Sequence, residues 1–202
     1  MLKPRTRIQE RNSKAILEAG LDVFSQQGFK GATLDQIADA AGLSKPNLLY
    51  YFPSKDAVYL ALLDQLLETW LDPLRHMNPK GEPVAEILGY VRRKLQLSRD
   101  FPRESRLFAN EILQGAPRVM AEIEGPLKSL VDEISTVLTR WMDEGRITRT
   151  HPVHLIFSIW ALTQHYADFD VQVRGVLGQG HDPYAEAQEF LDLLFRRLLT
   201  PT

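Results

Sequence analysis

The chain has 202 residues, of which 44% are hydrophobic and 25% charged, as in ordinary folded domains rather than disordered chains. It contains no cysteine, which excludes a disulfide framework, a thiolate metal site and a cysteine nucleophile. No apolar run approaches the roughly 18 residues of a membrane span, and no secretory leader pattern is evident, so we expect a cytoplasmic protein with no membrane partner.

The formal net charge of −2 is unevenly distributed along the chain. Residues 1–55 hold eight Lys and Arg against five Asp and Glu, so this segment carries +3 and the remainder −5. Five of the eight bases lie within the first fourteen residues, at Lys3, Arg5, Arg7, Arg11 and Lys14. Such a basic arm suits a phosphate backbone, and a solubilising tail is an equal alternative.

Apolar residues recur at helical spacing over residues 9–27, which predicts a first helix that Gly28 ends. Thr33 and Gln36 form a capping-box pattern that opens a short helix through residue 40. Gly42 then supplies a turn residue, and Ser44 caps a third helix that extends to about residue 52.

A long amphipathic helix follows, capped by Ser54 after Pro53 and closed by Pro73. A loop rich in Pro and Gly follows over residues 75–83. Further Pro and Gly residues lie between the helices expected after it. These are expected at 84–99, 103–114, 126–144, 152–172 and 184–199. No alternating strand pattern or internal repeat is found, so the sequence predicts an all-α protein.

The two short helices between residues 33 and 52 have the pattern of a helix-turn-helix. Ala38 is small where the helices cross, Gly42 allows the tight turn, and apolar residues pin the second helix. That second helix would enter a DNA major groove with its outer face. The outward side chains are expected to be Lys45, Pro46, Asn47 and Tyr50.

Three of these side chains have a matching group on DNA. Asn47 can form paired hydrogen bonds with adenine, Lys45 can reach guanine or phosphate, and Pro46 offers only apolar contact. We expect Thr33, Tyr51 and Lys55 to meet phosphates, Lys55 from the first turn of the long helix. Packing of the tyrosines is the alternative.

Residues 12–63, including FSQQGFKGATLDQIADAAGLSKPNLLYYFPSKDAVYLALL, resemble the DNA-binding domain of TetR-type repressors. The glycine-rich lead-in, the helix-turn-helix and the YYFPSKD exit all match. The resemblance implies that residues 45–51 are the recognition helix, that the protein is a homodimer on double-stranded operator DNA, and that the rest of the chain binds a small effector. The domains would be residues 1–54, for the basic arm and helix-turn-helix, and 55–202, for effector binding and dimerisation.

The helix expected at 152–172 places polar residues among apolar ones. Trp160 and Gln164 lie four residues apart and so share a face, where an indole and an amide would suit a planar ligand. The alternative is that Trp160 belongs to the core and that Gln164 makes an interhelical hydrogen bond. The last two helices are also those that pair across the two-fold axis in such regulators.

Most of the chain also resembles one branch of the family, the regulators of pyrimidine utilisation, in the WLDPL run and the segments SRDFPRESRLF, EILQGAP and HLIFSIWALTQHYADF. The branch implies uracil or thymine as effector, control of pyrimidine catabolism or related nitrogen metabolism, and no cofactor. Trp70 would then join Trp160 and Gln164 at the ligand, with Phe108, Glu111 and Gln114 as further candidates. Pro46 departs from the branch, which more usually has a polar residue there.

We hypothesise that a ligand bound around Trp70 and Trp160 shifts the helix at 55–72 and changes the spacing of the two recognition helices. An unrelated hydrophobic effector is the first alternative. A helical enzyme is the remote one, with His151 and His154 offered as metal ligands and Glu111 as a base, but no third ligand is apparent, so neither a metal site nor catalysis is expected.

Overall fold

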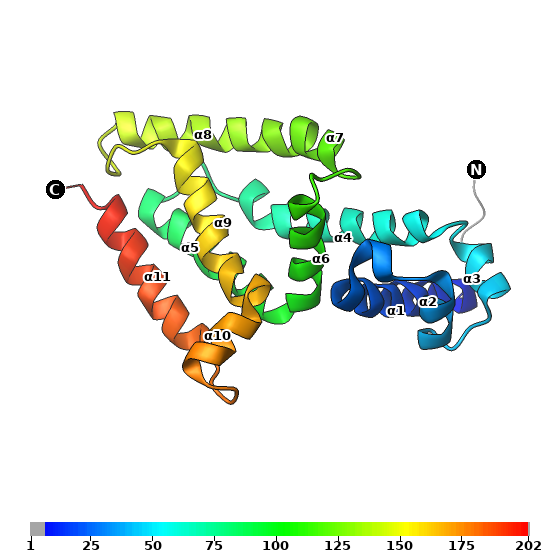
Figure 1. The fold of residues 1–202 in the computed structure, drawn as a ribbon. Coiled ribbons are helices and arrows are strands. Elements are labelled where there is room, and N and C mark those ends of the chain that lie inside the picture. The colour runs from blue at the N-terminus through cyan, green and yellow to red at the C-terminus, as the bar shows by residue number, and fades with distance from the viewer. Residues whose placement is uncertain (1–6, 202) are drawn as a thin grey trace. The chain divides into compact units, whose positions relative to one another are not determined.

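The computed structural model describes residues 7–201, and the regular structure in that range is entirely helical (Figure 1). The all-α prediction is thereby confirmed. The chain forms two compact units, one made of the chain up to Leu67 together with Arg106–Arg118, and the other of Glu68–Ser105 and Val119–Thr202. The units divide thirteen residues later than the boundary expected at residue 54, and the first also takes a segment from the middle of the chain.

The first unit contains α1 (Arg7–Gly31), α2 (Leu34–Ala40), α3 (Lys45–Tyr51) and most of α4 (Lys55–Arg75). Helical dihedral angles break inside α1 at Gly28, where φ is 67°, so the glycine ends the straight part of the helix as expected. Thr33 and Gln36 form the predicted capping box, and the hydroxyls of Ser44 and Ser54 cap α3 and α4. Local capping therefore sets the start of each short helix.

A close approach of α1 to α4 fixes the frame on which α2 and α3 rest. A Cβ atom added at Gly20 would lie 2.8 Å from Cγ1 of Val58, which is closer than carbon atoms pack. Phe24 and Tyr59 meet edge to face nearby, with ring centroids 4.8 Å apart. Glycine is needed at this position because the backbone of α1 at Gly20 lies directly against the side chain of Val58 on α4.

The second unit is built around α5 (Pro83–Asp100), which packs against α9 (Pro152–Asp168) and α11 (Tyr184–Leu199) (Figure 1). Also here are α8 (Lys128–Asp143), α10 (Asp170–Leu177) and the first residues of α6 (Pro102–Leu113). Trp141 and Leu88 lie in its buried core. None of the helices in the described part of the chain is long and apolar enough to cross a membrane.

Three expected helix boundaries are wrong. Helix α4 continues through Pro73 to Arg75, because a proline near the end of a helix removes only one hydrogen bond and Leu74 is fully buried. At Pro126 the chain stays helical, since α7 (Met120–Glu122) passes through a π-helical turn, η1 (Ile123–Leu127), into α8. The helix expected at 152–172 breaks at Phe169, whose φ of −113° and ψ of 31° separate α9 from α10.

Candidate nucleic-acid interface and ligand site

Helix α3 buries one side and exposes the side expected to read DNA. Leu48 is fully buried and pins the helix, while Lys45, Pro46 and Asn47 are exposed in its first turn. Tyr50, one turn later, is 70% exposed. Gly42 turns the chain between α2 and α3 with a φ of 66°, and the amide of Leu43 donates to the carbonyl of Ala38 across that turn. The structure thus brings all four expected base-facing residues to one accessible surface.

Among the four residues expected to face the bases, Lys45 forms an ion pair with another residue of the chain. Its Nζ lies 2.9 Å from a carboxylate oxygen of Asp35 on α2, and both side chains are largely exposed. An exposed pair of this kind contributes little to stability, so the ammonium can exchange the carboxylate for a DNA acceptor at small cost.

Both tyrosines of the recognition helix are held by the start of α1. The Nε2 of Gln9 donates to the hydroxyl of Tyr50 at 3.2 Å, and the Nδ2 of Asn12 donates to that of Tyr51 at 3.0 Å. Sequence reasoning missed Gln9 and Asn12, because these partners are about forty residues apart and lie on different helices. Of the basic arm, Lys3 and Arg5 lie outside the described residues.

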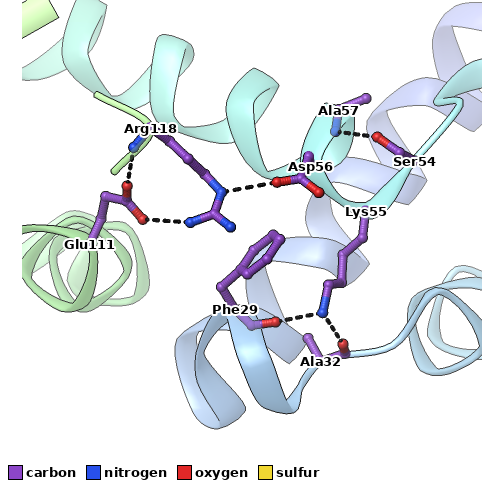
Figure 2. A network of polar contacts seen from close by, with 8 residues as sticks. All are labelled: Phe29, Ala32, Ser54, Lys55, Asp56, Ala57, Glu111 and Arg118. Carbon is purple, nitrogen blue, oxygen red and sulfur yellow. Dashed lines mark hydrogen bonds and ion pairs between the residues drawn. The ribbon is translucent and has the colours of Figure 1, made fainter. Parts of the chain in front are cut away.

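Thr33 and Lys55, both expected at phosphates, are engaged within the protein. The hydroxyl of Thr33 caps α2, although the side chain remains exposed. Figure 2 shows the Nζ of Lys55 donating to the carbonyls of Phe29 and Ala32, each at 2.7 Å. Two of the three donors of this ammonium are engaged by carbonyls at the end of α1, so its phosphate contact remains a prediction that the third donor would have to make.

Arg118 is the centre of a second network in the same unit (Figure 2). Its guanidinium carbon lies 3.5 Å from the ring centroid of Phe29, and its nitrogens pair with Asp56 at 3.1 Å and Glu111 at 3.4 Å. The backbone amide of Arg118 also donates to Glu111 at 2.8 Å. Burial, together with the carboxylate of Glu111, raises the pKa of Tyr59. These contacts bind the segment after α6 to α1 and α4.

The expected ligand residues are divided between the two units of the chain. Phe108, Glu111 and Gln114 belong to the first unit, whereas Trp70, Trp160 and Gln164 belong to the second. Glu111 is only 2% exposed and has its charge matched by Arg118, which gives it a structural role. Gln114 is exposed and Phe108 half-buried, so both remain candidates only.

Trp160 and Gln164 lie together on α9, as their spacing requires. The indole N–H of Trp160 donates to the hydroxyl of Tyr90 on α5 at 2.6 Å, so this nitrogen is already used. Burial raises the pKa of Tyr90. The half-buried amide of Gln164 makes no hydrogen bond to any residue in the range 7–201, so the interhelical bond weighed as the alternative is not formed there.

Trp70 contacts Lys94, a residue that no pattern in the sequence indicated. The Nζ of Lys94, on α5, lies 3.9 Å from the centroid of the Trp70 ring. Both side chains are buried, at 3% exposure for Lys94 and 5% for Trp70. Asp168, at the end of α9, accepts a hydrogen bond from the hydroxyl of Ser105, and its negative charge partly opposes the lowering of the pKa of Lys94 by burial. A buried lysine among apolar helix residues has no periodicity signature, so only the fold reveals it.

The rings of His151 and His154 lie close together, with centroids 4.6 Å apart and planes tilted by 56°. Across the described residues, no group of three or more His, Cys, Asp or Glu is arranged to hold a metal ion.

The fold and the exposed recognition helix define a helix-turn-helix DNA-binding protein. Two family models match the chain: bacterial regulatory proteins of the tetR family over residues 16–62, and the YcdC-like C-terminal region over residues 63–202. The chain therefore belongs to the TetR family of transcriptional regulators.

Among curated proteins, the HTH-type transcriptional regulator RutR of Escherichia coli K12 is 53% identical over 174 residues, covering 86% of this chain and 82% of that protein. The HTH-type transcriptional activator FasR of Mycolicibacterium smegmatis is 38% identical over 142 residues, covering 65% of this chain and 60% of FasR. These relatives are regulators, which removes the enzyme alternative.

Solved structures agree on the fold. A TetR-like transcriptional regulator from Rhodococcus sp. RHA1 aligns with a TM-score of 0.69 at 20% identity, covering 96% of this chain and 97% of that one. The fatty acid degradation regulator FadR from Bacillus halodurans aligns with a TM-score of 0.66 at 16% identity, covering 96% of each chain.

Proposed function

We propose that this protein is a dimeric regulator that binds a palindromic operator and releases it when a pyrimidine base, uracil or thymine, binds in the second unit. The observation that supports this most strongly is the 53% identity to RutR, a pyrimidine utilisation regulator, over most of both chains. The regulated genes would then serve pyrimidine breakdown or related nitrogen metabolism, and the protein would work in the cytoplasm, on the chromosome.

The second unit supports an effector of this chemistry. Uracil is flat and neutral, and its edge alternates C=O acceptors with N–H donors. The free amide of Gln164 presents one acceptor and two donors, and the ring of Trp160 lies one helical turn away. A polar, unpaired amide beside an aromatic ring favours a nucleobase over an acyl chain.

Dimerisation is supported by apolar side chains that the single chain leaves exposed. On α11, Phe190 is 56%, Leu193 50% and Leu198 41% exposed, and on α9 Phe157 is 47% exposed. Both helices pack against α5, and exposed large hydrophobic side chains of this kind are typical of an interface. These are the helices that the sequence resemblance assigned to the subunit contact.

Helix α4 offers a route from effector to DNA, since Lys55–Leu67 belong to the first unit and Glu68–Arg75 to the second. Trp70 lies on the second part of this helix. A ligand that moves Trp70 would displace α4, on which α1 packs at Gly20, and would change the spacing of the recognition helices in the dimer. Two such helices must lie about 34 Å apart, one turn of DNA, to bind together.

The DNA contacts are tested by Asn47→Ala, with Gln188→Ala, an exposed amide on α11, as the control. Loss of a paired hydrogen bond to adenine should weaken operator binding about 10- to 100-fold, with little change on unrelated DNA. Operator binding by the Asn47 variant equal to that of the control would contradict the assignment of α3.

The effector is tested by thermal unfolding with nucleobases. A ligand that binds only the folded protein raises Tm by mass action, so uracil or thymine should raise it and adenine should not. Gln164→Leu should abolish this response while sparing any response to an acyl compound. A Tm rise with acyl compounds alone would favour the hydrophobic-effector alternative.

A further inference from the structure

Two buried hydrogen-bond donors meet between α4 and α5. The indole N–H of Trp70 has no acceptor among the residues that the structure describes. Within residues 7–201, the interactions of the Lys94 ammonium are with the Trp70 ring, 3.9 Å away, and with the charge of Asp168. Burial lowers the pKa of Lys94 to about 7, so the amine holds its proton weakly there.

Such a pair is unfavourable for folding. A donor that loses its hydrogen bond to water on folding and finds no acceptor in the protein costs free energy, and a buried ammonium costs more. A methionine or leucine would fill the buried space of the Lys94 side chain without that cost. The pair therefore serves something other than stability.

We propose that Lys94 and the indole N–H of Trp70 are the carbonyl-binding groups of the effector site, which requires a ligand with hydrogen-bond acceptors directed at both. This rests on the proposed function and extends it to the selection of one class of base. Uracil and thymine carry two carbonyl oxygens, each of which can accept such a bond. Cytosine has an amino group in place of one carbonyl, and that group would direct a donor at a donor.

The remaining edge of the ligand can be bound from α9. Trp160, Gln164 and Asp168 lie at successive four-residue intervals and thus share a face of that helix. The hydroxyl of Ser105 holds the Asp168 carboxylate, which balances the charge of Lys94. Gln164 can then accept from a ring N–H. Because the ammonium covers one face of Trp70, the contribution of Trp70 is its N–H edge.

Two variants test the subsite by removing one donor each. Lys94→Met removes the ammonium, and Trp70→Phe removes the indole N–H while keeping an aromatic ring. Arg93→Met, at an exposed position next to Lys94, is the control. Calorimetric titration with uracil, 2-hydroxypyrimidine and cytosine measures the affinities, and circular dichroism checks folding.

We expect wild type and Arg93→Met to bind uracil alike. Lys94→Met should bind it about 10- to 100-fold more weakly, as loss of a charged hydrogen bond predicts, and should discriminate less between uracil and 2-hydroxypyrimidine, which lacks one carbonyl. Trp70→Phe should lose about 3- to 10-fold, as for a neutral hydrogen bond. If Lys94→Met does not fold, the uracil affinity of Trp70→Phe tests the proposed subsite by itself.

The outcomes separate the two proposals. Uracil binding by folded variants at wild-type affinity would overturn the subsite and leave water as the partner of these donors, while the pyrimidine effector would stand. A wild-type protein that binds neither uracil nor thymine would overturn the proposed function and this subsite with it.

Discussion

At the scale of single residues, Arg118 connects three segments of the first unit. It stacks on Phe29, pairs with Asp56 on α4 and neutralises the buried Glu111 near the end of α6 (Figure 2). The turn that places it contains Ala116, which has a left-handed φ of 53°. Such a conformation is uncommon for alanine, and its cost is met here by the contacts that the turn makes possible.

Arg118→Ala should lower the free energy of unfolding by about 3 kcal/mol, because it leaves the buried carboxylate of Glu111 without its cation. Urea unfolding measures this. Arg149→Ala, whose pair with Asp143 is exposed, should change stability by less than about 0.5 kcal/mol. Adding Glu111→Gln to Arg118→Ala should recover part of the loss, and a double variant as unstable as the sum of the singles would contradict the pairing.

Lys94 gives the folded protein a pH-dependent stability. Burial lowers its pKa from 10.5 to about 7, so between these values the unfolded chain binds a proton that the folded chain lacks. The free energy of unfolding therefore rises between pH 7 and 10.5. Below pH 7 the buried lysine is charged, and the full cost of burying its charge lowers the free energy of unfolding. Lys94→Met should raise Tm more at pH 6 than at pH 9.5. An equal change in Tm at both pH values would contradict the buried ammonium.

At the scale of helices, the contact between α1 and α4 depends on a single missing side chain. Gly20→Ala would place a Cβ 2.8 Å from Val58 and should destabilise the protein by about 1–3 kcal/mol through overpacking. Gly89→Ala on α5 is the matched control, since nothing lies within 4 Å of its added Cβ, and alanine there should stabilise by up to about 1 kcal/mol. Equal effects of the two changes in thermal unfolding would contradict the close approach.

The sequence predicted helices better than breaks in helices. Caps at Thr33, Ser44 and Ser54 use local side chains, so the starts of α2, α3 and α4 were predictable. The break at Phe169 follows no glycine or proline, so nothing local indicated it. The exposed face of α3 also followed from spacing, whereas the contacts of Gln9, Lys94 and Arg118 join residues distant in sequence and required the fold.

At the scale of the whole molecule, the account requires two copies of the chain. One recognition helix reads half of a palindrome, and binding both halves depends on the dimer. Helices α9 and α11 keep Phe157, Leu194 and Phe190 exposed in the single chain, which is the surface we assign to the partner.

Leu194→Glu should separate the dimer, because a charge buried opposite its own copy is strongly unfavourable. Light scattering after gel filtration should report about half the wild-type mass, and operator affinity should fall at least 10-fold as one half-site contact is lost. Glu189→Gln, at an exposed position of the same helix, is the control and should remain dimeric. A Leu194→Glu dimer with full operator affinity would place the interface elsewhere.

The central claim is that a pyrimidine base releases this regulator from its operator. Fluorescence anisotropy of labelled operator DNA at fixed protein concentration, titrated with uracil, thymine and adenine, measures that release. The account predicts that uracil or thymine lowers the operator-bound fraction in a saturable way and that adenine does not. Operator affinity unchanged at millimolar uracil and thymine would contradict it.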